Sequence, residues 1–301
     1  MMARFLTRCA LALGLGLALV SPAFPQESAA PGAPSGDIPS FYRVKAETSW
    51  DQRRLYFTVD LDMKAAGFRL PAGRLEAQRT IERDLPALME KAVFGLRVDS
   101  YRDVTASLED GTVDESGLLG LASSARFVDG AFSKDLRSFR AVYELPLEAA
   151  MGLYIRHSTA MTLDAPMEYR ATKPYTGIVI FAKGKLPIHG EGIEAPLSPC
   201  LFPRIYDENM NLLVDKNRVD PEALKAWGEV GYATGLNSEA ESRVGTSPLK
   251  IVAQDYFGTN RSDILISRDN ALKILGLPAN RSLIAAGKIL VILDSVTEIE
   301  Q

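Results

Sequence analysis

The chain has 301 residues, of which 47% are hydrophobic and 24% are charged. This balance is typical of a globular protein with a real core and excludes a fully disordered chain. The 34 basic and 38 acidic residues give a net charge of −4. A mildly acidic chain without a dense Lys/Arg run argues against a dedicated nucleic-acid binder, whose phosphate contacts need a basic patch.

The first 23 residues predict a bacterial-style secretory signal peptide. Arg4 and Arg8 give a positive start, an apolar run follows over 9–20, and Ala23 is the small residue before the expected cut. The run is too short to span a bilayer comfortably, so we expect no integral membrane span in the mature chain. A lipoprotein would carry a cysteine directly after the run, whereas Cys9 opens it. We therefore expect a periplasmic protein, with an uncut signal anchor as the alternative.

Removal of the signal peptide leaves Cys200 as the single cysteine of the mature sequence. No intramolecular disulfide could then form, and we expect Cys200 to be a small buried hydrophobe. Residues 24–39 are rich in Pro, Gly, Ala and Ser, which predicts a flexible, disordered linker.

The first predicted domain covers residues 40–150. Alternation of apolar and polar residues predicts its strands. They are expected over 42–48, 54–61, 125–132 and 138–147. The order ββ-α-α-ββ predicts an α+β layer, with helices packed on one face of a mixed or antiparallel sheet.

Two helices are expected between these strands. Apolar residues at three- and four-residue spacing predict a long helix through 81–96. Pro86 should kink it or restart it with Asp84 as a new cap. Thr112 and Glu115 match a capping box for a second, shorter helix.

A second small α+β domain is expected over 173–301, after a connector formed by 151–172. The nearly continuous apolar residues of 176–182 predict a strand buried on both faces. A last, central strand is expected over 288–293, and Gly and Pro predict a loop over 184–203.

Smaller elements of the second domain follow from turn and capping residues. A hairpin is expected to turn at 207–209, and helices are expected to start at Pro221 and after Ser267. Further strands are expected near 231–234, 249–253 and 263–266.

Two motifs match catalytic or metal-binding patterns only in part. Ser247 and Lys250 have S-x-x-K spacing, but Pro248 and the apolar residues that follow predict a strand, which separates the two side chains. Asp207 opens a stretch resembling a calcium loop, but its sixth position is Leu212 where the sharp turn needs Gly. The first pattern is better explained as the entrance to a strand and the second as a hairpin turn.

The two histidines, His157 and His189, lie in no recognisable catalytic or metal-binding constellation. We therefore predict a non-enzymatic protein with no catalytic, cofactor-binding or metal-binding residues. His189 lies in the Gly-rich loop, where it could contact a ligand or partner.

Aromatic residues near predicted element ends are candidate interface residues, because such side chains anchor protein contacts. Ordinary packing in the core or at an edge is the alternative. Together with His189 of the Gly-rich loop, the candidate interface residues are Trp50, Tyr101, Trp227, Tyr256 and Phe257.

The block Leu-Pro-Ala-Gly-Arg-Leu-Glu-Ala-Gln-Arg-Thr-Ile at 70–81, with a later strand over 139–145, resembles the N-terminal module of a flagellar-associated outer-membrane lipoprotein group (FlgP- and FlgT-like modules). The blocks at 175–182, 201–207 and 263–267 look like a segment that often accompanies this module. Members commonly carry a lipidated cysteine, which this chain lacks. The resemblance implies a structural or assembly role in the envelope, in rings around a periplasmic machine, and no catalytic residues.

The sequence thus predicts an exported structural or assembly protein of the cell envelope that acts through protein–protein contacts. Expected partners are envelope proteins, including flagellar basal-body components, or further copies of the chain in a homo-oligomer. Sheet edges or the 184–203 loop would make the contacts. The alternative is a periplasmic small-molecule or glycan-binding module, and a hydrolase without a recognised motif is a third reading.

Overall fold

The computed structural model of the protein describes residues 38–68 and 73–300. The predicted signal peptide and nearly all of the predicted linker lie outside the described residues. These described residues belong to one compact unit. Within the described ranges, no helix combines the length and apolar character needed to cross a membrane.

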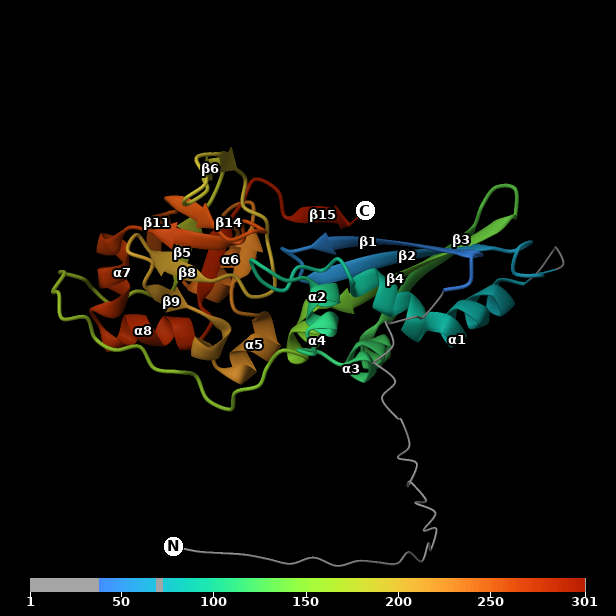
Figure 1. Cartoon of the computed structure of the whole chain (residues 1–301), viewed down its shortest axis with the longest axis horizontal. Helices are drawn as coiled ribbons and strands as arrows, with labels where there is room; N and C mark the ends of the chain where they lie inside the picture. Colours follow the sequence, from blue (N-terminus) through green and yellow to red (C-terminus); the bar gives the residue numbers. More distant parts are fainter. Residues whose placement is uncertain (1–37, 69–72, 301) are drawn as a thin grey trace, which may run out of the picture. The chain divides into compact units, whose positions relative to one another are not determined.

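An antiparallel sheet with strand order β15-β1-β2-β4-β3 forms the first domain (Figure 1). Four of its strands confirm the predicted ones: β1 (Tyr42–Ser49), β2 (Arg54–Asp62), β3 (Arg126–Phe132) and β4 (Ser138–Pro146). The fifth strand, β15 (Thr297–Glu300), comes from the other end of the chain and was not predicted.

Helix α1 (Arg74–Val93) packs against the sheet. The alternation in β2 buries Leu55 and Phe57 completely, in one core with Ile81 and Leu88 of α1. Shorter helical segments surround α1: α2 (Val104–Glu109), α3 (Glu115–Gly120), the 3-10 turn η1 (Leu121–Ser124) and α4 (Leu147–Gly152). Of these, α2 and α4 were not predicted.

The structure corrects two details of the predicted helix ends. Of the two alternatives at Pro86, the restart with Asp84 as a new cap is wrong: helix α1 continues through Pro86, and Asp84 accepts a hydrogen bond from the Tyr42 hydroxyl (2.8 Å). The packed apolar face of α1 holds the helix together across the missing proline N–H. Helix α3 is capped by Asp114, whose Oδ1 accepts the N–H of Gly117 (2.8 Å), so the Thr112 capping box does not form.

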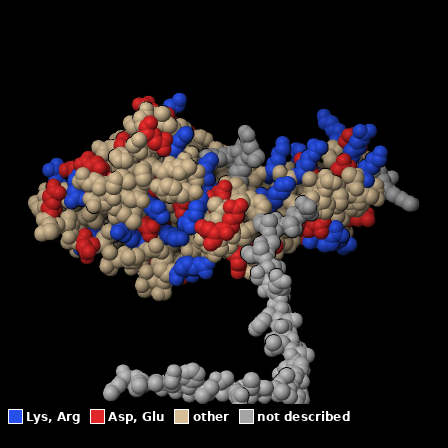
Figure 2. Space-filling view, in the orientation of Figure 1, with Lys and Arg blue, Asp and Glu red and all other residues tan. Residues whose placement is uncertain are grey.

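The other face of the first sheet is charged. Arg43, Asp60 and Arg140 are cross-strand neighbours, and the Arg140 guanidinium binds both carboxylate oxygens of Asp60 (2.7 and 3.0 Å). Figure 2 shows Lys and Arg side chains gathered along this part of the molecule, with Asp and Glu between them. This face therefore has the character of a solvated sheet surface.

The second domain contains a parallel sheet with strand order β10-β14-β5-β11. Both β5 and β14 are interior strands of this sheet, as the sequence predicted from their apolar runs. The strands are β5 (Ile178–Phe181), β10 (Gly231–Ala233), β11 (Leu249–Val252) and β14 (Ile289–Ile292).

A second, mixed sheet has strand order β12-β13-β8-β9. It consists of β8 (Ile205–Asp207), β9 (Leu212–Val214), β12 (Asp255–Phe257) and β13 (Asp263–Ile266). The hairpin β8–β9 is confirmed, and the buried Asp207 carboxylate accepts hydrogen bonds from the N–H groups of Asn209 and Asn211 and from the Arg268 guanidinium. The hydrogen bonds of Asp207 therefore stabilise the turn of this hairpin.

Four helices and a 3-10 turn complete the second domain in the described residues: η2 (Lys216–Arg218), α5 (Pro221–Trp227), α6 (Ser238–Val244), α7 (Arg268–Leu275) and α8 (Pro278–Ala285). Helices α5 and α7 confirm the predictions from Asp220-Pro221 and Ser267. Pro278 begins α8 instead of only ending α7. The predicted loop carries the short pair β6 (Leu186–Pro187) and β7 (Glu194–Ala195).

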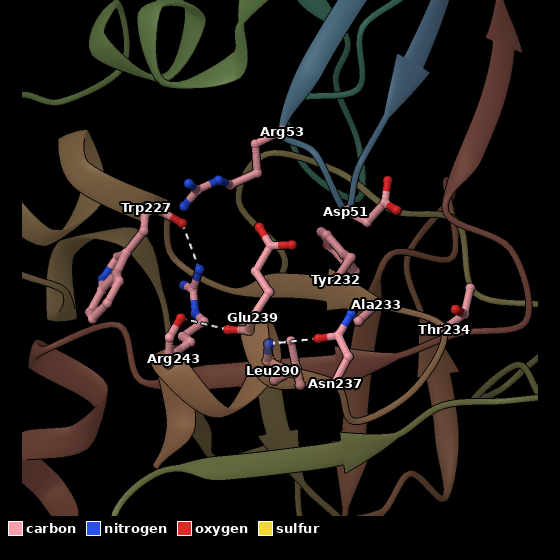
Figure 3. Close-up of a pocket in the computed structure, with 13 residues that line it drawn as sticks. Asp51, Arg53, Trp227, Tyr232, Ala233, Thr234, Asn237, Glu239, Arg243 and Leu290 are labelled. Atoms are coloured by element: carbon pink, nitrogen blue, oxygen red, sulfur yellow. Dashed lines mark hydrogen bonds between the residues drawn. The ribbon is translucent and has the colours of Figure 1, made fainter.

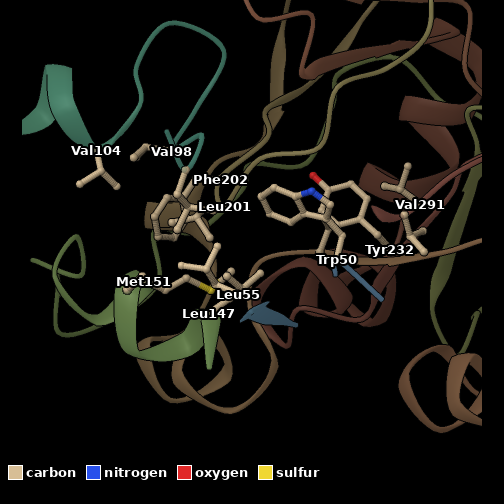
Figure 4. Packing of buried hydrophobic residues seen from close by; sticks show 14 of the residues in the cluster. Trp50, Leu55, Val98, Val104, Leu147, Met151, Leu201, Phe202, Tyr232 and Val291 are labelled. Carbon is tan, nitrogen blue, oxygen red and sulfur yellow. The ribbon is translucent and has the colours of Figure 1, made fainter. Parts of the chain in front are cut away.

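The two domains share one hydrophobic core (Figure 4). Trp50 and Leu55 of the first domain and Phe202 and Tyr232 of the second belong to the same buried cluster. The pairing of β15 with β1 also places the last described strand in the first domain's sheet. The predicted second domain, 173–301, therefore needs a correction, because its final strand completes the other domain.

Candidate interaction surface

The loop between α1 and α2 joins the first domain to the second by backbone hydrogen bonds. The N–H of Leu201 donates to the carbonyl of Arg97 (3.0 Å), and the N–H of Phe202 donates to the carbonyl of Val98 (2.9 Å). These bonds fix the start of the loop against the second domain.

Asp99 closes the next turn of this loop. Its Oδ1 accepts hydrogen bonds from the backbone N–H groups of Tyr101 (2.9 Å) and Arg102 (3.0 Å). Its Oδ2 accepts a hydrogen bond from Nη2 of Arg102 (2.7 Å). A carboxylate with these partners holds the turn in a single shape. Tyr101 is left half exposed within the turn.

The turn after β12 approaches the same loop so closely that a side chain at Gly258 would collide. Gly258 has a φ of +89°, and a Cβ there would lie 2.4 Å from the Cβ of Ser100. The N–H of Asn260 donates to the carbonyl of Ser100 (2.8 Å), and the Ser100 hydroxyl donates to the carbonyl of Phe257 (3.3 Å). This contact sets the position of Phe257 relative to Tyr101.

Phe257 is the centre of an aromatic cluster, which we name the Phe257 cluster and define as Tyr101, His189, Tyr206 and Phe257. The ring centroids of Tyr101, His189 and Tyr206 lie 6.4, 6.2 and 6.1 Å from the centroid of Phe257, each in an edge-to-face arrangement. Edge-to-face pairs at this separation are favourable. Three of the six predicted interface residues come together here, from separate segments of the chain.

A polar pair borders the cluster. Nδ1 of His189 lies 3.1 Å from Oδ2 of Asp255, and the two side chains are 40% and 30% exposed. The pair orients the imidazole beside Phe257. In residues 38–68 and 73–300, no group of three or more His, Cys, Asp or Glu residues could hold a metal ion.

Burial raises the pKa values of three groups at the cluster and beside it. Burial, with a further contribution from the charge of Asp263, raises the pKa of Tyr101 and of Tyr206. Burial also raises the pKa of Asp263 to about 6, although the N–H of Arg204 donates to its Oδ1 (2.8 Å). Both tyrosine hydroxyls therefore stay protonated at neutral pH. The cluster thus offers two tyrosine rings with neutral hydroxyl groups, which suits a protein contact.

Two of the predicted interface residues are buried, and for them the prediction is wrong. Trp50 is 2% exposed and Tyr256 is 0% exposed. Trp50 fills the shared core, and Tyr256 lies in β12 with its side chain turned inward, opposite to Phe257. Successive side chains of a strand point to opposite faces, and no local pattern indicated which of these two faces outward.

The sixth predicted residue, Trp227, lies away from the Phe257 cluster and covers Arg243. The Cζ of Arg243 is 5.4 Å from the Trp227 ring centroid. The buried guanidinium donates to the carbonyls of Trp227 (2.6 Å), Gly228 (2.9 Å) and Gly287 (3.0 Å). Arg243 thus satisfies carbonyl groups at the C-terminal ends of α5 and α8, a role that suits a cation at helix C-termini.

A pocket of about 150 Å³ lies beside this arginine (Figure 3). The turn between β1 and β2 contributes Asp51 and Arg53, and α6 contributes Glu239 and Arg243. Gly231 allows the guanidinium to lie over β10, because a Cβ there would be 3.1 Å from Nη1 of Arg243. The pocket is therefore shared by both domains.

Several residues of these sites were not singled out by the sequence. Tyr206 was seen only as part of a hairpin, and Asp255 gave no sign that it would reach His189. Arg243 lies in an unpredicted helix whose start at Asn237 carries a capping residue: its side-chain oxygen accepts the N–H of Ala240 (2.8 Å). This capping residue is the local signal from which helix α6 could have been predicted.

The fold and these contacts define a two-domain α+β protein whose domains share one core. Residues 42–153 match the family model described as Treponema pallidum Tp0624, N-terminal domain. Residues 177–295 match the model described as Treponema pallidum Tp0624, second domain. Both matched ranges lie close to the predicted domains, and β15 follows the second of them. No curated protein matches this chain. Neither description mentions a flagellar lipoprotein, so that resemblance remains a prediction.

Proposed function

We propose that this protein is an exported, non-enzymatic component of the bacterial cell envelope that acts as a rigid scaffold and binds partner proteins through the Phe257 cluster. The observation that carries this proposal is the Phe257 cluster itself: its four rings meet beside the 97–102 loop, which joins the two domains. Aromatic side chains with polar tips are enriched at protein interfaces.

Rigidity of the frame supports the role of a scaffold. Hydrogen bonds between the 97–102 loop and the second domain, the shared core and the β15–β1 pairing all oppose motion between the domains. A surface held in place before binding loses little conformational entropy when a partner docks. The cluster therefore needs little rearrangement to make a contact.

Two features of the sequence support the proposed export and the proposed kind of partner. The signal-peptide pattern of residues 1–23 supports a periplasmic location. The resemblance to flagellar-associated modules supports envelope proteins as partners, with flagellar basal-body components among them. A second copy of the chain is the other partner to test.

Photo-crosslinking in whole cells tests the proposal. A benzoylphenylalanine replaces Tyr101, which is 50% exposed in the cluster, and in a matched control it replaces Tyr169, which is 88% exposed on the connector. After irradiation, the envelope is fractionated and crosslinked proteins are identified by mass spectrometry. We expect an envelope protein crosslinked at Tyr101 and not at Tyr169.

A second substitution, Tyr101→Ala, should abolish co-purification of the same partner while leaving the thermal unfolding temperature unchanged. Recovery of both crosslinker variants as free periplasmic monomers would contradict a scaffold role. Crosslinking at Tyr169 alone would contradict the Phe257 cluster as the contact surface. Recovery from the cytoplasm would contradict export.

A further inference from the structure

The pocket between the β1–β2 turn and α6 contains a positive charge, on Arg243, that forms no direct ion pair with a described carboxylate. Arg53 forms an ion pair with Glu148 (3.0 Å). The charge of Glu148 also favours the charged form of Arg243, while the charge of Arg53 opposes it. A guanidinium has five N–H donors, and the three carbonyl acceptors leave two of them available. The wall of the pocket can therefore still bind an anionic group.

A carboxylate without a partner lines the same pocket. Glu239 is exposed on α6 and, within the described part of the chain, forms no ion pair. Asp51 is less available, because its Oδ1 accepts hydrogen bonds from the Ser49 hydroxyl (2.6 Å) and the Gln52 N–H (2.9 Å). The pocket thus presents one available cation and one available anion.

The size of the pocket suits a small polar ligand. Its volume is about 150 Å³, which is enough for several atoms. Glycine and alanine are small molecules that carry one anionic and one cationic group.

We propose that this pocket binds the zwitterion of a small α-amino acid, with the ligand carboxylate on Arg243 and the ligand ammonium on Glu239. Charge-assisted hydrogen bonds at both ends would orient the ligand. Trp227, which lines the pocket, would lie next to it (Figure 3). This site is distinct from the Phe257 cluster and does not depend on the proposed scaffold role.

Titration of the ¹⁵N-labelled protein by NMR tests the proposal. The probes are glycine, L-alanine, D-alanine, acetate, methylammonium and phosphate. The indole N–H of Trp227 reports on the pocket, and that of the buried Trp50 serves as an internal reference; Trp227→Phe assigns the two signals. We expect a saturable shift of the Trp227 signal with glycine or alanine, and affinities for acetate and methylammonium at least about tenfold weaker.

Two neighbouring substitutions on α6 provide a test variant and its matched control. Glu239→Gln should weaken glycine binding by about tenfold or more, because a neutral amide replaces the carboxylate that binds the ammonium. Glu241→Gln removes a charge from the same helix outside the pocket and should leave the affinity unchanged. Acetate or phosphate binding as tightly as glycine would overturn the proposal in favour of a simple anion site. No saturable shift with any probe would overturn it altogether.

Discussion

The indole of Trp50 packs edge-on against the phenol ring of Tyr232, with ring centroids 5.6 Å apart and planes at 70°. Trp50 follows β1 in the first domain, and Tyr232 lies in β10 of the second. The Tyr232 hydroxyl donates a hydrogen bond to the carbonyl of Cys200 (3.0 Å). The side chain of Tyr232 is therefore held by the ring contact with Trp50 and by this hydrogen bond. This pair sits within the core that the two domains share.

Replacement of Trp50 by Ala should destabilise the whole described unit and not the first domain alone. Loss of a buried large aromatic side chain costs about 3–5 kcal/mol. Urea unfolding followed by far-UV circular dichroism measures the change. The exposed Leu136→Ala should change the free energy of unfolding by less than about 0.5 kcal/mol. Two separate transitions in the Trp50 variant, with one at the original midpoint, would contradict a shared core.

Replacement of Arg243 by Met should be strongly destabilising, although Arg243 forms no direct ion pair with another described residue. The carbonyls of Trp227, Gly228 and Gly287 would lose their donors, and each buried acceptor without a donor costs about 1–3 kcal/mol. We expect a total loss of about 3 kcal/mol or more in urea unfolding. Arg79→Met on the exposed face of α1 is the control and should be nearly neutral. Equal stabilities of the two variants would show that the carbonyl contacts contribute little.

Replacement of Gly258 by Ala tests the close approach to Ser100. Gly258 and Gly184 both have positive φ, at +89° and +77°, but only Gly258 has an atom where a Cβ would lie. Gly184→Ala should cost only the backbone strain, about 1 kcal/mol. Gly258→Ala should cost at least about 2 kcal/mol more, because the collision with Ser100 forces the two segments apart. Similar losses for both variants, measured by thermal unfolding, would contradict the tight contact.

Replacement of Asp263 by Asn should stabilise the protein most at high pH. Burial raises the pKa of Asp263 to about 6 in the folded state, above its usual value of 3.8. Ionisation therefore opposes folding fully above pH 6, and the penalty fades as pH falls towards 3.8. Since one pKa unit corresponds to about 1.4 kcal/mol, the penalty at pH 8 is of the order of 2–3 kcal/mol. Unfolding midpoints of Asp263→Asn and wild type should differ at pH 8 and converge towards pH 4.5, whereas Glu241→Gln should show no such convergence.

Replacement of Glu229 by Met should also stabilise the protein. Glu229 is fully buried, and no residue in the described part of the chain forms a hydrogen bond with either of its carboxylate oxygens. Burial raises the pKa of this carboxyl well above its usual range. An apolar side chain of similar size removes the cost of burying the polar group. A rise in the midpoint of urea unfolding is expected, and a fall would mean that Glu229 has a partner in solution, such as a bound water.

Local patterns were sufficient for most strands and for the class of fold. Alternation in residues 54–61 identified β2, and the apolar run of 289–293 identified β14 as an interior strand. Helix α7 was identified from Ser267, whose hydroxyl accepts the N–H of Asn270. Each of these signals lies within the element itself, so no knowledge of distant segments was required.

The candidate surface could be predicted only in part. Tyr101, His189 and Phe257 were singled out as aromatic or loop residues near element ends. Trp50 and Tyr256 have the same local pattern and are buried. Exposure depends on which segments pack over a residue, and that is set by contacts between parts of the chain far apart in sequence.

The sequence by itself determined the α+β class, the two domains and the order of most strands, because periodicity, caps and turns are properties of neighbouring residues. Only the tertiary structure decided that β15 completes the first domain's sheet and that Arg243 binds three carbonyls. It also decided that Tyr206 joins the Phe257 cluster. Each of these contacts joins groups that are distant along the chain. The groups become neighbours only when the two domains pack into one core.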